Sequence, residues 1–269
     1  MDEPVTWHHG LMTLWWAEVN QPRPEEVAFY RGAIERFGQP ALDLACGVGR
    51  ILLPLLQAGL DVDGVDVSID MLDQARRRAE ARGLSPSLTA QAMHDLDLPR
   101  RYRTVFICDS FGIGVARAET IRSVERIYEH LEPGGALVFS HDLPYASGET
   151  DWLRWLPGRH EGPDPWPEEG GRGRLANGDE LELITRHASF DPLEQETVLE
   201  VRCRLWRDGD LLQEEEHRIV LGGYFVQEVV ALLGSVGFVD VAVEAGYTRA
   251  PATSEDTTVV FVARRPNEP

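Results

Sequence analysis

From residue 41 to residue 140, short apolar runs alternate with amphipathic segments. Ile121, Val124, Ile127 and Leu131 follow a helical spacing and form one apolar stripe, and the glycines at 134 and 135 end that segment. This alternation predicts a parallel sheet with helices on both faces. The expected strands cover 41–45, 61–67, 87–92, 104–108 and 136–140, and the expected helices 48–58, 69–82 and 117–131.

The alternation is flanked by helices on one side and interrupted on the other. Residues 10–20 and 24–37 have helical patterns, and the second segment opens on Pro24. Residues 156–174 contain four prolines and five glycines, which predicts a loop. Strand patterns follow at 179–190, 194–207 and 210–220.

The last two of these strands are joined by Asp208-Gly209, a strong type I′ hairpin signal. If Arg207 pairs with Asp210, Arg202 should face Glu215 and Glu200 should face His217. An antiparallel insertion is therefore expected between the central strands and the end of the chain.

The chain then returns to the α/β pattern, with a helix at 224–236 and strands at 238–245 and 257–265 that must pair antiparallel. We therefore expect an α/β fold: a Rossmann-like, seven-stranded, mostly parallel sheet with an antiparallel last strand, plus N-terminal helices and an antiparallel β insertion. The expected parts are an N-terminal helical cap (1–37), a Rossmann-like domain (38–145 and 222–265) and the insertion (146–221), which would form a substrate lid or a homodimer contact.

Charge and composition exclude several classes of function. The net charge is −19, so the surface should repel nucleic acid, and no basic patch offsets it. All 26 basic residues are arginine, which excludes Schiff-base chemistry on lysine. No membrane span or signal peptide is visible, and the three scattered cysteines suit a reducing compartment, so a cytoplasmic location is expected.

The chemistry centres on the stretch "ALDLACGVGR", residues 41–50. Small residues at Ala45, Gly47 and Gly49 let a ligand approach the backbone at the start of a helix, and Asp66, 19 residues after Gly47, suits the hydroxyls of a ribose. This predicts a nucleoside-binding site. A dinucleotide site would need a third glycine where Leu52 stands, and that glycine is absent. A NAD-dependent oxidoreductase is therefore only the second choice.

At this point the sequence resembles the class I S-adenosylmethionine-dependent methyltransferases. "LDLACGVGR" is similar to their motif I, "GVDVSIDMLDQARRRA" to their second-strand acid and its helix, "LEPGGALVFS" to the run into their fifth strand, and "GFVDVAV…TTVVFVARR" to their terminal strand pair. The insertion resembles those of small-molecule members, including glycine and amino-sugar N-methyltransferases.

The resemblance implies S-adenosyl-L-methionine as methyl donor and S-adenosyl-L-homocysteine as product. It places Asp43, Ala45, Gly47 and Gly49 around the methionine part and Asp66 on the ribose. Ala45 replaces the usual first glycine of the loop.

The adenine end also departs from the family. Gln91-Ala92 stands where many relatives carry Gly-Asp, leaving Met93 to line the ring and either Asp95 or Gln91 to meet the adenine amine.

The reacting groups should lie beyond the carboxyl ends of the fourth and fifth strands. Cys108 is expected there beside the cofactor, and His141 is the first candidate for a general base, followed by Tyr145 and Asp109. His8-His9 has no third ligand near it in sequence, so no metal is expected. The tryptophans at 7, 15, 16, 152, 155 and 166 are candidates for an aromatic lid.

The sequence therefore predicts transfer of a methyl group to a nitrogen or oxygen of a small molecule, with an amine favoured because an acidic protein attracts cations. Two alternatives remain open: the NAD-dependent oxidoreductase, and a protein that binds S-adenosylmethionine without methylating.

Overall fold

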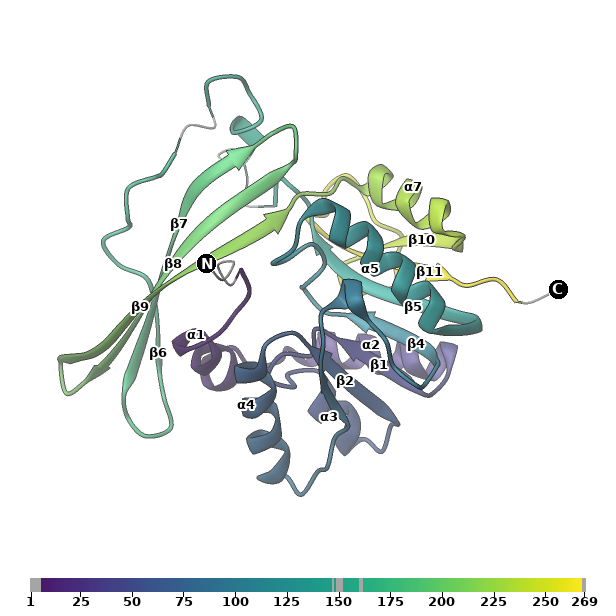
Figure 1. Ribbon diagram of the computed structural model, residues 1–269, viewed down its shortest axis with the longest axis horizontal. Helices are drawn as coiled ribbons and strands as arrows, with labels where there is room; N and C mark the ends of the chain where they lie inside the picture. The colour runs from purple at the N-terminus through teal and green to yellow at the C-terminus, as the bar shows by residue number, and fades with distance from the viewer. Residues whose placement is uncertain (1–5, 147, 149–151, 160–161, 268–269) are drawn as a thin grey trace.

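The computed structural model describes residues 6–146, 148, 152–159 and 162–267, which form two β-sheets and the helices around them (Figure 1). The larger sheet has seven strands in the order β10-β11-β5-β4-β1-β2-β3. Its strands are β1 (Ala41–Leu44), β2 (Val62–Asp66), β3 (Leu88–Ala90), β4 (Tyr102–Ile107), β5 (Leu131–Asp142), β10 (Val239–Ala245) and β11 (Thr258–Arg264).

The first five of these strands are parallel, whereas β11 runs antiparallel to both β5 and β10. The predicted Rossmann-like sheet with its antiparallel last strand is thus confirmed. Because the order reverses between β1 and β4, their carboxyl ends diverge and leave a crevice at that edge.

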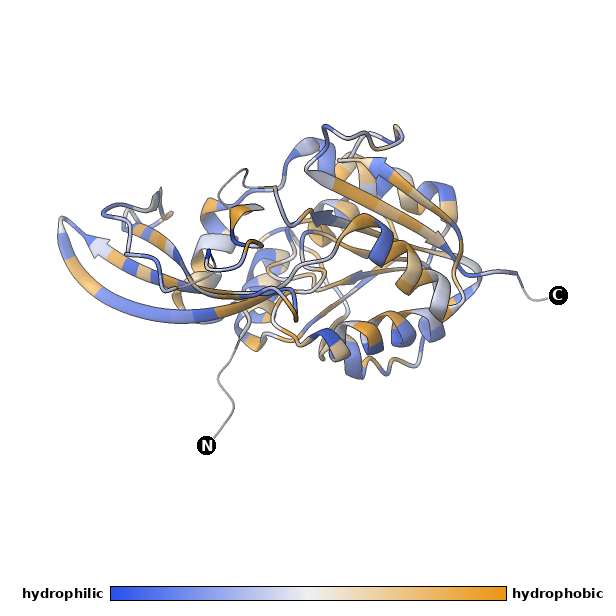
Figure 2. Cartoon of the chain, turned by 90° about the horizontal axis from the view of Figure 1, so that it is seen from above, coloured by the Kyte–Doolittle hydropathy of each residue, from blue (hydrophilic) through white to orange (hydrophobic). Residues whose placement is uncertain are grey.

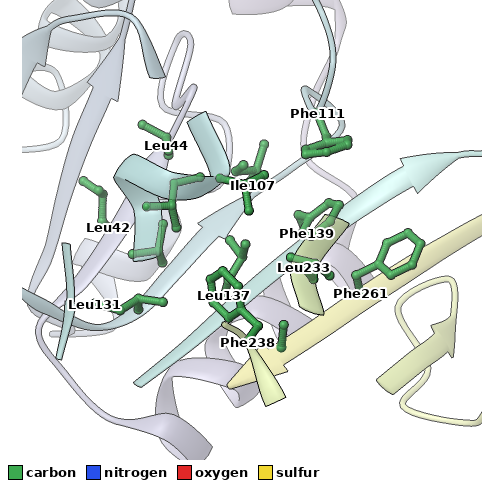
Figure 3. Packing of buried hydrophobic residues seen from close by; sticks show 14 of the residues in the cluster. Leu42, Leu44, Ile107, Phe111, Leu131, Leu137, Phe139, Leu233, Phe238 and Phe261 are labelled. Atoms are coloured by element: carbon green, nitrogen blue, oxygen red, sulfur yellow. The ribbon is translucent and has the colours of Figure 1, made fainter. Parts of the chain in front are cut away.

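Alternating residues of the central strands build two cores. On β5, Leu137 and Phe139 pack with α5 (Arg117–His130) and α7 (Val226–Val236) in the core shown in Figure 3. Ala136 and Val138 face the other core, which contains residues of α2 (Pro24–Phe37), α3 (Leu52–Gln57) and α4 (Ile69–Glu80). This period of two decides which strand-end side chains meet at the site.

The second sheet is antiparallel, with strands β6 (Gly171–Arg174), β7 (Glu180–Asp191), β8 (Glu196–Arg207) and β9 (Asp210–Gly222) in sequence order. Seen from above, it is strongly curved, and hydrophobic and hydrophilic residues alternate along it (Figure 2). The insertion is therefore present, although β6 lies in the segment predicted to be a loop. Its sequence, GRGR, lacks the apolar alternation that marks a strand.

The register predicted for the β8–β9 hairpin was wrong by one residue. Arg207 does pair with Asp210, but an irregularity at Leu205/Trp206 shifts the later pairs. Arg202 consequently faces Glu216, with their side chains 2.6 Å apart, and Glu200 faces Arg218. A β-bulge adds one residue to one strand, and the sequence pattern does not reveal it.

The N-terminal segment packs under the second sheet. Its first helical part divides into α1 (Leu11–Leu14) and a π-helical turn, Trp15–Val19, instead of the single helix predicted for 10–20. Leu11 and Met12 join a hydrophobic cluster with Val201 and Ile219 of the second sheet. Among the described residues, no helix is long and apolar enough to span a membrane.

Candidate active site

A cavity of about 720 Å³ lies between the carboxyl edge of the large sheet, the N-terminal segment and one face of the second sheet. It brings together residues that are far apart in sequence: the loop after β1, Asp66 at the end of β2, and Cys108 and Asp109 after β4. Cavities of 300–1,000 Å³ are typical of small-molecule sites.

The glycine-rich loop has the backbone that ligand approach requires. Gly47 has φ +53°, and no atom lies within 4 Å of the position that a Cβ would take, so the loop leaves open space there. At Gly49, φ +75°, a Cβ would lie 2.9 Å from Leu53, so this glycine is needed for packing and not for the cavity. Ala45 adopts φ +61°, the left-handed region that its usual glycine would occupy without strain.

Asp66, at the end of β2, hydrogen-bonds the glycine-rich loop. Its two carboxylate oxygens accept hydrogen bonds from the backbone N–H groups of Gly47 and Ser68, each at 2.8 Å. Burial raises the pKa of Asp66, and these two hydrogen bonds oppose the shift. The carboxylate therefore sits on the cavity wall in a fixed position beside the glycine-rich loop.

Asp43 lies below the loop and does not line the cavity. It is 2% exposed, its Oδ2 atom has no hydrogen-bond partner among the described residues, and burial raises its pKa well above the ordinary value. The Asp43 carboxylate accepts a hydrogen bond from the backbone of Leu52, so it contacts the start of α3, just after the glycine-rich loop.

The end of the cavity next to β3 is lined by Gln91, Met93 and His94. The Gln91 Oε1 atom accepts a hydrogen bond from the backbone of Asp97 at 3.0 Å. Asp95 points elsewhere, because it forms an ion pair with Arg122 at 2.9 Å and does not line the cavity. Of the two candidates for the adenine amine, only Gln91 lies on the wall.

Asp109 is the one base candidate on the wall of the large cavity. Its Oδ1 atom accepts hydrogen bonds from Ser140 and Tyr247, both at 2.7 Å, and its Oδ2 atom lies 3.2 Å from Arg50. Because both oxygens of this carboxylate are already engaged by these donors, the contacts favour a positioning role.

Arg50 connects Asp109 to a buried acid beneath the cavity. Its guanidinium forms an ion pair with Glu26, which is only 1% exposed, and lies 3.2 Å from the sulfur of Cys108. Glu26, Cys108 and Asp109 bring potential metal ligands within 4.8 Å of one another, but the guanidinium contacts all three. Burial, with Asp109 adding to it, raises the pKa of the Cys108 thiol.

His141 and Tyr145 do not line the large cavity. His141 is 7% exposed and lines an adjoining pocket of about 140 Å³, which shares Phe111 and Gly112 with the large cavity. Its Nε2 lies 3.0 Å from the carbonyl oxygen of Tyr224, and burial lowers its pKa, so the ring is neutral at pH 7 with Nε2–H as donor. Tyr145 packs at the edge of the core instead.

The roof of the cavity comes from the N-terminal segment and the second sheet. Trp7, Trp15 and Trp16 line it, whereas the tryptophans at 152, 155 and 166 do not. The backbone N–H of Leu11 donates to Glu215 of β9 at 2.7 Å, and the rings of His9 and His217 meet at 3.2 Å. The roof is therefore fastened to the insertion by polar contacts as well as by apolar packing.

Comparison with known proteins identifies this architecture. Residues 41–135 match a family model described as a methyltransferase domain, and that span contains the glycine-rich loop, Asp66 and Asp109. This chain carries a methyltransferase domain. The resemblance inferred from its motifs is thereby confirmed for the domain and the fold.

Solved methyltransferase structures cover nearly the whole chain. An S-adenosylmethionine-dependent methyltransferase from Clostridium acetobutylicum superposes with a TM-score of 0.70 at 16% identity, covering 93% of this chain and 94% of that one. CalS10, an amino pentose methyltransferase from Micromonospora echinaspora, gives 0.64 at 20% identity, covering 96% and 98%. The fold outside the matched domain is therefore also that of methyltransferases.

Sequence relatives match over shorter stretches. A protein from Geobacillus sp. (strain WCH70), named as a methyltransferase, is 30% identical over 138 residues, 49% of this chain and 56% of its own length. An N,N-dimethyltransferase from Streptomyces fradiae, named for a dTDP-linked amino sugar, is 36% identical over 98 residues, 36% of this chain and 37% of its own. An RNA methyltransferase from Parasynechococcus marenigrum is 35% identical over 157 residues, 57% of this chain and 32% of its own.

Several residues around the large cavity were not predicted from the sequence. Arg50 follows Gly49 directly, a position that could have drawn attention to it, but Glu26 looked like an ordinary acid in a first helical turn. Tyr247 and Ser140 reach Asp109 from distant elements, and no local pattern marks either one.

Acid should destabilise the roof of the cavity. The His8 ring packs against Trp16 at 5.0 Å, and burial, aided by His217 and His9, lowers the pKa of His8 to about 4. Between about pH 4 and 6.5, His8 binds fewer protons in the folded state than in the unfolded state. The stability that His8 contributes is therefore lost as pH falls through that window, and below it His8 adds no further change.

We expect the melting temperature of His8→Gln to fall less steeply than that of the wild type between pH 7 and 4. Parallel curves for the two proteins would contradict this assignment.

Proposed function

We propose that this protein transfers the methyl group of S-adenosylmethionine to a nitrogen or oxygen atom of a small molecule. One observation carries the proposal: Asp66, the open backbone at Gly47 and the Cys108-Asp109 turn line a single cavity of about 720 Å³. Much of the wall of the same cavity is apolar, and a second, small ligand could pack against it.

The residues present fit the cofactor. The open space over Gly47 admits a ligand against the loop backbone, and Asp66 offers two oxygens to ribose hydroxyls. Ala45 and Gly47 would surround the methionine part and Met93 would lie on the adenine, with Gln91 near its amine. Asp43 and Gly49 would support the loop from beneath, and Cys108 would lie at the sulfur end.

When bound, the cofactor would supply an electrophilic methyl group on a sulfonium, for transfer to a lone pair of the acceptor with S-adenosylhomocysteine as leaving group. The protein's own residues bind, orient and exclude water, because positioning supplies much of the rate of such a displacement. Asp109, held by Ser140, Tyr247 and Arg50, would fix the position of the turn after β4.

A base is needed only if the acceptor arrives protonated. His141 remains our first candidate, with Tyr145 and Asp109 behind it. Its neutral ring and its place in the adjoining pocket, which shares Asp109 with the large cavity, support that assignment. Turnover of His141→Gln that matches the wild type from pH 6 to 9 would remove it from the mechanism.

We propose an amine as acceptor and no role for nucleic acid. The net charge of −19 disfavours polyanions, and two of the similar proteins are named as amino-sugar methyltransferases. The N-terminal cap and the insertion would close over the acceptor, since both supply residues to the cavity wall.

Calorimetric titration with S-adenosylmethionine, S-adenosylhomocysteine and NADH tests the proposed cofactor. We expect micromolar binding of the first two and none of NADH. Binding of NADH alone would overturn the proposal in favour of the oxidoreductase. Tight binding of S-adenosylmethionine without product release across a screen of amines and alcohols would instead favour a protein that binds but does not methylate.

A further inference from the structure

The cavity wall contributed by the second sheet is almost entirely apolar. Leu199 and Val201 of β8 alternate with outward-facing residues, and Ile219 and Leu221 of β9 continue the same surface. Leu199 and Ile219 are directly paired across the two strands. This apolar wall, defined by these four residues, lines the same cavity as the glycine-rich loop.

The apolar wall is joined rigidly to the turn after β4. The backbone N–H of Gly114 donates to Val220 at 2.7 Å, and that of Gly222 donates to Gly112 at 2.8 Å. A ligand held on this wall is therefore held against the carboxyl edge where Asp109 lies, because the two surfaces form one unit.

The charges lining the cavity are unbalanced. Among the described residues on its wall, Arg50 is the one arginine, and it is already paired with Glu26 and Asp109. The carboxylates on the wall are Asp66, Asp109, Glu119 and Glu196. His8 lines the cavity too, but its lowered pKa of about 4 keeps it neutral at pH 7.

This distribution is unsuited to an acceptor that carries phosphate. Diphosphates are bound by arginine, lysine or helix N-termini that donate several charge-assisted hydrogen bonds. The first turn of α5 also lines the cavity, but Glu119 caps it by accepting the backbone N–H of Ala116 at 2.9 Å. Burying a diphosphate beside four carboxylates and one neutralised arginine is therefore strongly unfavourable. The Streptomyces fradiae relative is named for a dTDP-linked sugar, so this cavity differs from what such a substrate needs.

Glu196 offers the complementary interaction. It begins β8, three residues before Leu199, pairs with Gly222 of β9 and is half-buried on the cavity surface. Within the part of the chain that the structure describes, its carboxylate forms no hydrogen bond and no ion pair, whereas Glu119 caps the backbone of Ala116 at 2.9 Å. Glu196 is thus available to a cationic group of a ligand.

We propose that the acceptor is a phosphate-free amine with an apolar body, which packs on the apolar wall while its ammonium or N–H group meets Glu196. This rests on the proposed function and specifies its substrate class. It predicts that a nucleotide-linked amino sugar is not the acceptor.

Binding of an uncharged apolar dye to the protein saturated with S-adenosylhomocysteine tests the proposal. N-phenyl-1-naphthylamine should bind saturably, and 4-phenylbutylamine should displace it about tenfold better than 4-phenylbutanol, since the amine adds a charge-assisted hydrogen bond. Thymidine diphosphate should not displace it. Failure of the dye to bind, or displacement by thymidine diphosphate, would overturn the proposal.

Two variants test whether Glu196 is the residue that contacts the amine. Glu196→Gln should abolish the preference for the amine over the alcohol, whereas Glu194→Gln, an exposed acid outside the cavity, should preserve it. An unchanged preference in Glu196→Gln would exclude this carboxylate. Calorimetric binding of S-adenosylhomocysteine, measured first, separates the two ideas: if it is absent the proposed function fails, and if it is present only the acceptor class is at stake.

Discussion

Asp66→Ala should weaken the binding of S-adenosylmethionine by about 1.5–3 kcal/mol, because two charge-assisted hydrogen bonds to the ribose would be lost. That corresponds to roughly a 10- to 150-fold rise in Kd, which calorimetry resolves easily. The effect should be large because the wild-type carboxylate is already held in place by Gly47 and Ser68, so it needs little reorganisation to bind.

Asp73→Ala provides the matched control for this measurement. Asp73 lies on α4, pairs with Arg76 at the surface and does not line the cavity. The control should bind the cofactor with wild-type affinity. Because Asp66→Ala also leaves two backbone N–H groups without their partner, its melting temperature must be recorded alongside. A folded Asp66→Ala protein with unchanged Kd would refute the ribose assignment.

The elements that the sequence predicts well are those with a strong period. The alternation of apolar runs and amphipathic helices located the five parallel strands and the helices between them, because each had to bury one recognisable face. Strand β6 escaped prediction because its glycines and arginines carry no such period, and its place in the sheet depends on pairing with β7. The hairpin register failed for a similar reason, since a bulge changes the pairing without changing the composition.

Sequence periodicity also could not predict which individual side chains reach the site. The sequence placed His141 correctly at the end of β5, but not on which face of the sheet it lies. Phe139 and His141 point toward Phe111 and Tyr224, whereas Ser140, one residue away, reaches Asp109 at 2.7 Å. Because neighbouring strand residues face opposite sides, an uncertainty of one residue decides which of them reaches Asp109.

Contacts between segments that are distant in the sequence could not be predicted from any local pattern. Tyr247 follows β10, yet its hydroxyl donates to Asp109, and Arg50 joins a helix near the N-terminus to the turn after β4. These contacts depend on how the whole sheet brings its edges together. The glycine-rich loop and Asp66 could be predicted because their spacing in sequence is itself part of the site.

Glu26→Gln should lower the free energy of unfolding by about 3 kcal/mol, although the residue lies outside the cavity. The Glu26 side chain is 1% exposed and pairs with Arg50, whose side chain is 12% exposed. Removing one charge leaves the guanidinium buried with only Asp109 to balance it. For a chain of this size, the melting temperature should fall by roughly 6–12 °C.

Glu25→Gln tests whether burial is the cause, because this neighbouring acid is 56% exposed and lies 4.0 Å from Arg23. Its effect should stay within about 0.5 kcal/mol, as expected of a surface pair. The double variant Glu26→Gln/Arg50→Met should recover part of the loss, because it removes the unbalanced charge as well as the partner. Equal destabilisation by Glu25→Gln and Glu26→Gln would show instead that the ion pair beneath the cavity contributes no more than a surface contact.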